Sequence, residues 1–250
     1  MIHSFLLIGQ SNMAGRGFLH EAVEVDNSHI KTLRNGRWVK MFRPINPDRS
    51  FSGVSLGERF AERYAQKYGV DVGLICCADG GTQIEQWQAG GILLDNAIYQ
   101  AKLASRTSTI AGVLWHQGES DCSDELLRAT YEQSFLAIMK ELRDTLDLHD
   151  VPFLIGGLGD YLVDYAGVDC SGYRDINDTL ERIAQNNPMT GFVKSEGLTP
   201  NSDNLHFSAQ SLYELGNRYF EVYEQIRDLK KVFLEKDTKN AAIQSGMELM

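Results

Sequence analysis

The amino-acid sequence predicts a single three-layer α/β/α domain, in which helices cover both faces of a parallel sheet of about five strands. Short apolar segments of strand length alternate along the chain with amphipathic segments of helical length. Strands separated by helices of this length pair in parallel through right-handed crossovers. Hydrophobic residues make up 43% of the 250 residues and charged residues 23%, which is typical of a globular protein that buries a full core.

The individual elements follow from residue type and periodicity. Five apolar segments rich in residues that favour a pleated sheet are predicted strands, namely residues 2–8, 70–78, 110–115, 151–156 and 191–193. Five amphipathic segments are predicted helices, namely residues 56–68, 93–105, 124–146, 176–186 and 209–229. Gly69 is the expected C-cap of the first helix and Ser123 the expected N-cap of the third. Residues 18–54 are irregular, and Asn35-Gly36 within them predicts a β-hairpin.

The domain is expected to span residues 1–230, followed by a charged tail, residues 231–250, that forms a peripheral helix or is partly disordered. The first apolar run leads directly into a polar motif, without a basic leader or a small-residue cleavage site, and no segment approaches the roughly 20 apolar residues of a membrane span. We therefore expect a cytoplasmic protein. The net charge of −10 argues against binding to nucleic acid or to an anionic membrane.

No metal or organic cofactor is expected. The four cysteines have no Cys-x-x-Cys spacing, so they indicate neither a zinc site nor a redox pair. His116 invites a metal interpretation together with Glu119 or Asp121. No second or third histidine has ligand spacing, however, so a histidine that braces its loop is the favoured interpretation.

Ser11 is the strongest candidate for a reactive residue. It follows the first predicted strand within the sequence Gly-Gln-Ser-Asn-Met-Ala-Gly at residues 9–15. In an open α/β sheet, ligands bind at the carboxyl ends of the strands, where a serine hydroxyl can face a substrate and free N–H groups can hold an oxyanion. The alternative is a serine that only caps a helix.

Four polar clusters follow predicted strands and should converge at one edge of the sheet. They are residues 9–15, 79–83, 116–121 and 202–206. A serine nucleophile needs an adjacent base, and His206 is the best candidate, with Asp203 three residues earlier to orient its imidazole. The alternative is an Asp203 that caps a helix and a His206 at the surface.

The second and third clusters offer hydrogen-bond donors. Gly80 and Gly81 allow close approach of the backbone to a ligand, although an ordinary tight turn needs them equally. Gln117 can donate a side-chain N–H to the same oxygen, or it can simply hold its loop, as can Glu119. Trp87 either stacks on a sugar or packs in the core.

Together these motifs resemble those of the SGNH-hydrolase superfamily, in the branch of the sialate O-acetylesterase-like and acetylxylan esterase-like carbohydrate esterases. The motifs are Gly-Gln-Ser-Asn-Met-Ala-Gly, Gly-Gly-Thr at 80–82, Trp-His-Gln-Gly-Glu-Ser-Asp at 115–121 and Asp-x-x-His at 203–206. The resemblance covers roughly residues 2–210. It implies a flavodoxin-like fold of the SGNH type and a cofactor-free esterase that removes acetyl groups from O-acetylated sugars.

The resemblance also implies roles for individual residues. Ser11 would be the nucleophile and His206 the general base, with Asp203 as the usual acid and Glu119 as a competing or assisting carboxylate. The oxyanion hole would be formed by the amide of Ser11, an amide of Gly80 or Gly81, and the side chain of Gln117. Gln10, Asn12 and Trp87 are the expected substrate-binding residues.

The sequence also bears on three other functions. A broader lipase or thioesterase is disfavoured because no long apolar lid is visible. A catalytically silent carbohydrate-binding protein should have a broken nucleophile–base pair, whereas Ser11 and His206 are both present. Phosphate binding at the Gly80-Gly81 turn lacks a Lys or Arg nearby in the sequence.

Overall fold

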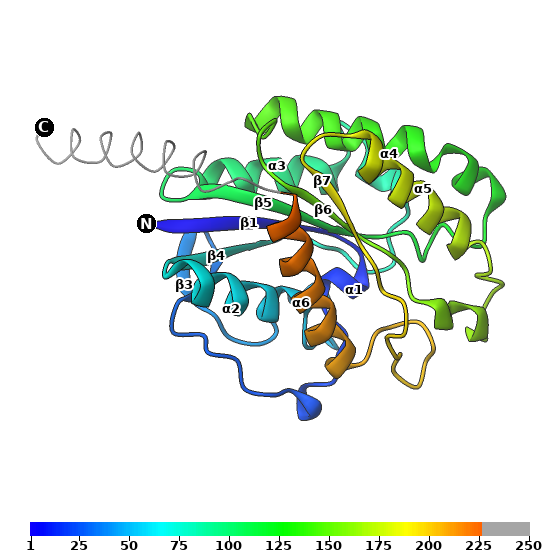
Figure 1. Cartoon of the computed structure of the whole chain (residues 1–250), viewed down its shortest axis with the longest axis horizontal. Coiled ribbons are helices and arrows are strands. Elements are labelled where there is room, and N and C mark those ends of the chain that lie inside the picture. The colour runs from blue at the N-terminus through cyan, green and yellow to red at the C-terminus, as the bar shows by residue number, and fades with distance from the viewer. Residues whose placement is uncertain (227–250) are drawn as a thin grey trace, which may run out of the picture.

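Seven strands form one sheet in the computed structural model, which describes residues 1–226. The strands are β1 (Ile2–Gly9), β2 (Ile30–Arg34), β3 (Arg37–Lys40), β4 (Asp71–Cys76), β5 (Thr109–His116), β6 (Phe153–Gly156) and β7 (Thr190–Val193). Their order in the sheet is β3-β2-β4-β1-β5-β6-β7, and neighbours are parallel except for β2 and β3 (Figure 1). The predicted parallel α/β fold is confirmed, with more strands than the five expected.

The additional strands come from the hairpin that Asn35-Gly36 predicts. Both residues have a positive φ, 49° at Asn35 and 72° at Gly36, which suits the tight turn between β2 and β3. β2 also pairs in parallel with β4 over only three residues, from Ile30 to Thr32. The sequence therefore predicts the hairpin, but this short pairing, which attaches it to the sheet edge, depends on the fold.

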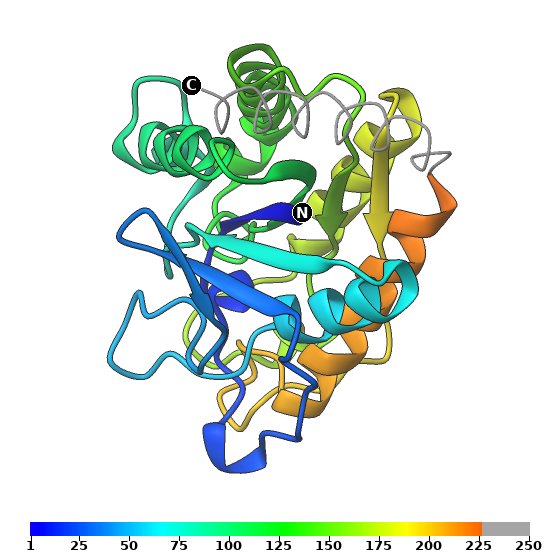
Figure 2. The ribbon, with the colours of Figure 1, turned by 90° about the vertical axis from the view of Figure 1, so that its left-hand side faces the viewer.

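Helices cover both faces of the sheet. The short α1 (Ser11–Ala14), α2 (Leu56–Tyr68) and α6 (Ala209–Gln225) lie on one face. The other face carries α3 (Ile92–Ala104), α4 (Glu125–Leu146) and α5 (Tyr173–Asn186), and the two layers are separate in both views (Figures 1 and 2). The 3₁₀ turns η1 (Leu19–Glu21), η2 (Ile84–Trp87) and η3 (Asp160–Asp164) lie in the connecting loops.

Capping side chains determine where the helices begin and end. α2 has the predicted bounds, because Ser55 and Glu58 form a capping box at its start and Gly69, at φ 65°, ends it in the left-handed conformation. The prediction that Ser123 caps α4 is wrong. Asp124 is the N-cap, and its carboxylate accepts hydrogen bonds from the backbone N–H groups of the second and third helical residues. The predicted tail, residues 231–250, lies outside the described residues.

The core is packed with aromatic side chains on both faces of the central strands. On one face the ring of Phe5 lies edge-to-face against Phe60 and Tyr64, with ring centroids 4.8 Å apart in both pairs. On the other face Trp115 packs against Phe135 at 5.2 Å. Such pairs stabilise a fold by about 0.5–1.5 kcal/mol each beyond their burial. β1, β4 and β5 are thereby held firmly, and the loops at their carboxyl ends carry the site described next.

Candidate active site

Ser11 lies directly after the central strand, at the start of the single-turn helix α1, and is 5% exposed. The turn before it requires glycine. Gly9 has a φ of 126°, and a Cβ there would lie 2.1 Å from the carbonyl oxygen of His116. This close approach of β1 to β5 places the serine beside the loop that follows β5.

Ser11, His206 and Asp203 form a continuous chain of hydrogen bonds. His206 Nε2 lies 3.0 Å from Ser11 Oγ, and His206 Nδ1 lies 2.7 Å from Asp203 Oδ2. This geometry leaves one ring nitrogen to accept the serine proton while the other is held by the carboxylate. The three residues that the sequence predicts as nucleophile, base and acid are thus in direct contact.

The backbone of the 203–206 loop holds Asp203 in place. Asp203 Oδ1 accepts hydrogen bonds from the N–H groups of Leu205 and His206, both at 3.0 Å, and Asn204 takes a φ of 51° to close the turn. Partial burial raises the pKa of Asp203, but these N–H groups and the imidazole together lower it by more. The pKa of Asp203 therefore lies below its ordinary value. Asp203 is therefore ionised at neutral pH.

Glu119, the competing carboxylate, does not contact the imidazole of His206. Its side chain is 2% exposed, and its Oε1 accepts a hydrogen bond from Asn12 Nδ2 at 2.5 Å. The nearest ring nitrogen is Nε2 of His116, at 3.5 Å from Oε1. Of the two carboxylates that the sequence offers, Asp203 contacts the imidazole of His206 and Glu119 contacts Asn12.

Asn12 links the turn that carries Ser11 to the loop that carries His206. Its Oδ1 accepts a hydrogen bond from the N–H of Phe207 at 3.0 Å, and its Nδ2 donates to the carbonyl of Leu205 at 3.3 Å as well as to Glu119. These contacts hold the backbone on both sides of His206. The prediction that Asn12 binds substrate is wrong, because the side chain is 1% exposed and its amide is bonded within the protein.

The two glycines after β4 differ in their availability to a ligand. The N–H of Gly80 donates to Asp48 Oδ2 at 2.9 Å, so Gly80 is not the free donor that the sequence allowed. Gly81 has a φ of 76°, open space around its Cα, and no acceptor for its N–H within residues 1–226. The N–H of Ser11 has no acceptor within these residues either. These two amides are the backbone donors left for an oxyanion.

Gln117 does not occupy the position expected of an oxyanion donor. The residue is fully buried, and its Nε2 donates to the carbonyl of Thr82 at 2.9 Å, to Gln10 Oε1 at 3.2 Å and to Asp121. Its Oε1 accepts a hydrogen bond from Tyr131. The prediction that Gln117 donates to an oxyanion is therefore wrong. Its amide connects three loops behind the site, and its two N–H groups have no capacity left for a substrate.

Gln10 is the glutamine that lies at the cavity. Its Oε1 accepts hydrogen bonds from Gln117 and from the backbone N–H groups of Gly118 and Ser120, which orients the amide. Its Nε2 has no hydrogen-bond partner within the described residues, and the residue lines the cavity. The prediction that Gln10 binds substrate therefore stays open, with Nε2 as the contacting group.

Trp87 packs in the core, so the prediction that it stacks on a sugar is wrong. Its side chain is fully buried, its Nε1 donates to Thr82 Oγ1 at 3.0 Å, and its ring lies edge-to-face against Trp115 at 5.6 Å.

Asp121 is also fully buried and accepts a hydrogen bond from the N–H of Ile84 at 3.0 Å. Burial raises the pKa of Asp121 to about 6.

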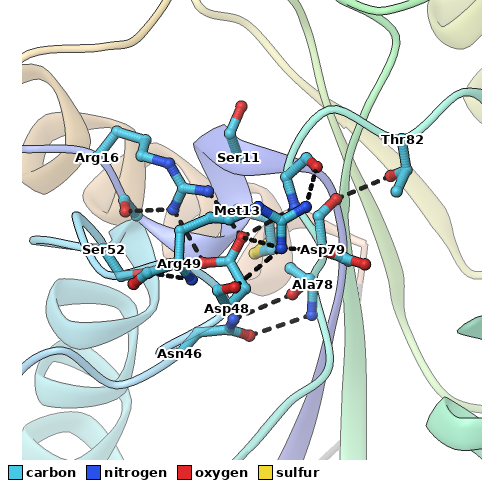
Figure 3. A network of polar contacts seen from close by, with 12 residues as sticks. Ser11, Met13, Arg16, Asn46, Asp48, Arg49, Ser52, Ala78, Asp79 and Thr82 are labelled. Atoms are coloured by element: carbon cyan, nitrogen blue, oxygen red, sulfur yellow. Dashed lines mark hydrogen bonds and ion pairs between the residues drawn. The ribbon is translucent and has the colours of Figure 1, made fainter.

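Two arginines that the sequence analysis did not select, Arg16 and Arg49, lie beside Gly80. Arg16 binds Asp48 through both terminal nitrogens, at 3.0 and 2.7 Å, and Arg49 Nη1 donates to Asp79 Oδ1 at 2.7 Å (Figure 3). Figure 3 shows both guanidinium groups close to Asp48, below the Ser11 hydroxyl. Arg16 directly follows the serine motif, and this was the only available signal. Arg49 lies in an irregular loop that sequence patterns do not place.

A cavity of about 430 Å³ opens above Ser11 and His206. Its walls include Gly81, Gln10 and Glu119, together with Arg16 and Leu205 from the loops of Ser11 and His206. Arg49, Phe51, Tyr165 and Val168 also line it and come from loops that the sequence could not assign. Within the described residues, no group of three or more His, Cys, Asp or Glu side chains could hold a metal ion, and no helix there is long and apolar enough to cross a membrane.

Comparison with known proteins identifies the family. Residues 1–225 match the family described as carbohydrate esterase, sialic acid-specific acetylesterase. The chain belongs to this family. A probable carbohydrate esterase from Arabidopsis thaliana is 28% identical over 242 residues, which cover 88% of this chain and 89% of that protein. The resemblance drawn from the motifs is confirmed, and the protein is a carboxylic-ester hydrolase.

Solved structures agree with the fold. The crystal structure of the Arabidopsis thaliana protein covers 89% of this chain and 98% of its own, with a TM-score of 0.76 and 28% identity. The crystal structure of NanS superimposes with a TM-score of 0.71 at 16% identity, covering 90% of this chain and 97% of NanS. The second match bears on the fold alone.

Proposed function

We propose that this carbohydrate esterase removes acetyl groups from O-acetylated sugars through an acyl-enzyme on Ser11. The observation that carries the proposal is the chain of hydrogen bonds from Ser11 through His206 to Asp203, at 3.0 and 2.7 Å, at the base of the cavity. A serine hydroxyl is a weak nucleophile at neutral pH, and an adjacent imidazole oriented by a carboxylate is the usual means of activating it.

Each step can be assigned to a residue. His206 takes the proton from Ser11 as Oγ attacks the acetyl carbonyl carbon, and the N–H groups of Ser11 and Gly81 bind the oxygen that becomes negative. His206 then gives this proton to the sugar oxygen as the bond between that oxygen and the acetyl carbon breaks, so that the sugar leaves with a free hydroxyl and the acetyl group stays on Ser11. A water molecule repeats the sequence on the acetyl-serine and releases acetate. Asp203 keeps the imidazole in the required tautomer throughout.

Glu119 and Asn12 act as positioning residues in this proposal. Asn12 holds the backbone on both sides of His206, and Glu119 holds Asn12. A displacement of a catalytic group by about 1 Å can cost on the order of 10²-fold in rate, so a buried clamp of this kind has a direct effect on turnover.

The alternatives are weaker on the same geometry. A silent binding protein does not need a serine and a histidine in hydrogen-bond contact. A lipase or thioesterase needs an apolar cleft for an acyl chain, whereas two arginines and a buried glutamate reach this cavity. The identity of the acetylated sugar, of the sialic acid or the xylan type, and the cytoplasmic location stay predictions.

Replacement of Ser11 by Ala tests the function. We expect the Ser11→Ala variant to keep its fold by circular dichroism and to lose on the order of 10⁵–10⁶ in kcat, because loss of the serine alone removes most of the catalysis by a triad. The measurement is acetate release from an aryl acetate, acetylated xylo-oligosaccharides and O-acetylated sialic acids. Ser202→Ala, an exposed serine of the base loop, is the matched control. Near-normal hydrolysis by Ser11→Ala would contradict the proposal.

A further inference from the structure

A second cavity of about 530 Å³ adjoins the first, on the other side of the base. The two cavities share Arg16, Phe51 and His206 in their walls. Phe18 and Leu19, at the start of η1, line the second cavity but not the first. His206 therefore lies between two hollows, and a ligand longer than one sugar can extend across it from one hollow to the other.

Three exposed apolar side chains line the second cavity. Phe51 is 68% exposed, Phe18 is 42% exposed and Leu19 is 48% exposed. The ring of Phe18 is stacked on His20 with centroids 5.5 Å apart and an interplanar angle of 13°, and the guanidinium of Arg16 lies 5.2 Å from the ring centroid of Phe51. Clustered exposed apolar groups on a cavity wall mark a binding surface, and stacked rings lose little freedom when a ligand arrives.

The chemistry of this wall suits a sugar ring. A pyranose presents a face of C–H groups that packs on an aromatic ring, and hydroxyl groups around its rim that need polar partners. The second cavity supplies both, because the exposed Ser50 and the half-exposed Asp203 lie beside the apolar groups. A long acyl chain forms no hydrogen bonds with these polar groups.

The charges favour a neutral sugar over an anionic one. Both arginines of the first cavity are already paired with carboxylates, Arg16 with Asp48 at 2.7 Å and Arg49 with Asp79 at 2.7 Å. Glu119 adds a buried negative charge to the same wall. A substrate carboxylate would need an uncompensated cation here, and the arginines of this wall do not supply one.

We infer that the second cavity is a subsite for the neighbouring units of a neutral acetylated oligosaccharide, whose acetylated unit lies in the first cavity. The inference rests on the proposed function, since it places the reacting ester at Ser11. It names the substrate class as an oligosaccharide of uncharged pyranoses, with Phe18 and Leu19 binding the units that do not react. These side chains determine specificity and take no part in the chemistry.

The experiment compares substrates of different length and charge. They are an acetylated methyl xyloside, an acetylated xylotetraose, a mono-O-acetylated N-acetylneuraminic acid and an aryl acetate. We expect kcat/KM to be about tenfold higher for the tetrasaccharide than for the xyloside, since one aromatic contact of this kind is worth up to about a factor of ten. We expect the gain to reside in KM, because a remote subsite binds ground state and transition state alike.

Phe18→Ala and Leu19→Ala should remove most of this length preference and leave the aryl acetate unaffected. Phe42→Ala is the matched control, because Phe42 is 53% exposed but lines neither cavity. Equal kcat/KM for both xylose substrates, or a preference for the acetylated N-acetylneuraminic acid that Phe18→Ala does not change, overturns the inference. If the wild-type protein hydrolyses none of these esters, the aryl acetate included, the result contradicts the proposed function instead.

Binding keeps the two outcomes separate. Acetylated xylotetraose titrated into the Ser11→Ala variant in a calorimeter reports affinity without turnover. We expect Phe18→Ala, added to this variant, to weaken that affinity by about tenfold, in line with one lost ring contact. Unchanged affinity overturns the subsite whether or not Ser11 is the nucleophile.

Discussion

Two loops each contribute a carboxylate to the candidate site, and they hold it in opposite ways. In the 203–206 loop, Asp203 has a side chain that is 45% exposed and contacts the imidazole of His206 directly. In the loop after β5, Glu119 has a side chain that is 2% exposed and contacts Asn12 instead. The carboxylate of the loop after β5 is thus a buried support, whereas the carboxylate of the Asp-x-x-His motif contacts the histidine that lies beside Ser11.

The physical reason lies in solvent access. A carboxylate on a turn can be fixed by the N–H groups of its own loop, so Asp203 needs no deep burial to keep its position. A carboxylate that is taken out of water needs partners from elsewhere, because burial disfavours its charged form. Glu119 finds such a partner in Asn12, and through it holds the two loops together.

Of the two carboxylates, Asp203 should have the larger effect on turnover. Asp203→Asn should lower kcat by about 10⁴, because an amide at this position favours the wrong imidazole tautomer. Steady-state hydrolysis of an aryl acetate measures this, with thermal unfolding as the check on the fold. A loss below tenfold would show that another carboxylate orients His206.

Two variants of Glu119 distinguish a residue that positions Asn12 from one whose negative charge acts on His206. Glu119→Ala should lower kcat by about 10², since Asn12 loses its support and the base loop shifts. Glu119→Gln keeps an oxygen that accepts from Asn12 and should recover most of this loss, so that it stays within about tenfold of the wild type. The readout is kcat and KM for both variants. If Glu119→Gln is as slow as Glu119→Ala, the negative charge itself acts on His206.

Gln117 tests whether the buried loop also contributes to the chemistry. Gln117→Ala should lower the free energy of unfolding by about 2–4 kcal/mol, because it leaves a cavity and removes a donor from buried Asp121. The change in kcat should stay below about tenfold, whereas the loss of a true oxyanion donor costs about 10²–10³. Denaturant unfolding together with kinetics on one ester distinguishes these outcomes.

The smallest effect is a pH dependence of stability that comes from Asp121. Its pKa is raised to about 6 in the folded protein from an ordinary value of 3.8, so the folded state holds the proton more tightly than the unfolded state. The free energy of unfolding therefore gains a component that falls as pH rises from about 4 to 6, by about 3 kcal/mol in all. Urea unfolding across this range should show this component in the wild type but not in Asp121→Asn. Parallel curves for the two proteins would contradict the assignment.

Much of the fold and part of the site could be predicted from the sequence. Alternation of apolar and amphipathic segments predicts the parallel sheet and the bounds of α2. Asn35-Gly36 predicts the hairpin, and the motifs bring Ser11, Asp203 and His206 together as expected. These features depend on local periodicity, on turn chemistry, or on the rule that the carboxyl ends of parallel strands meet at one edge.

The tertiary structure alone decided which polar side chains face the cavity. Gln10 and Gln117 are both glutamines that follow a strand, yet Gln117 points into a pocket of acceptors and only Gln10 lines the cavity. Gly80 and Gly81 are adjacent, and Asp48, distant in sequence, occupies the amide of one of them. A sequence specifies which donors exist. Which of them remain unpaired depends on acceptors that the fold brings from far along the chain, and these contacts decide what is available to a substrate.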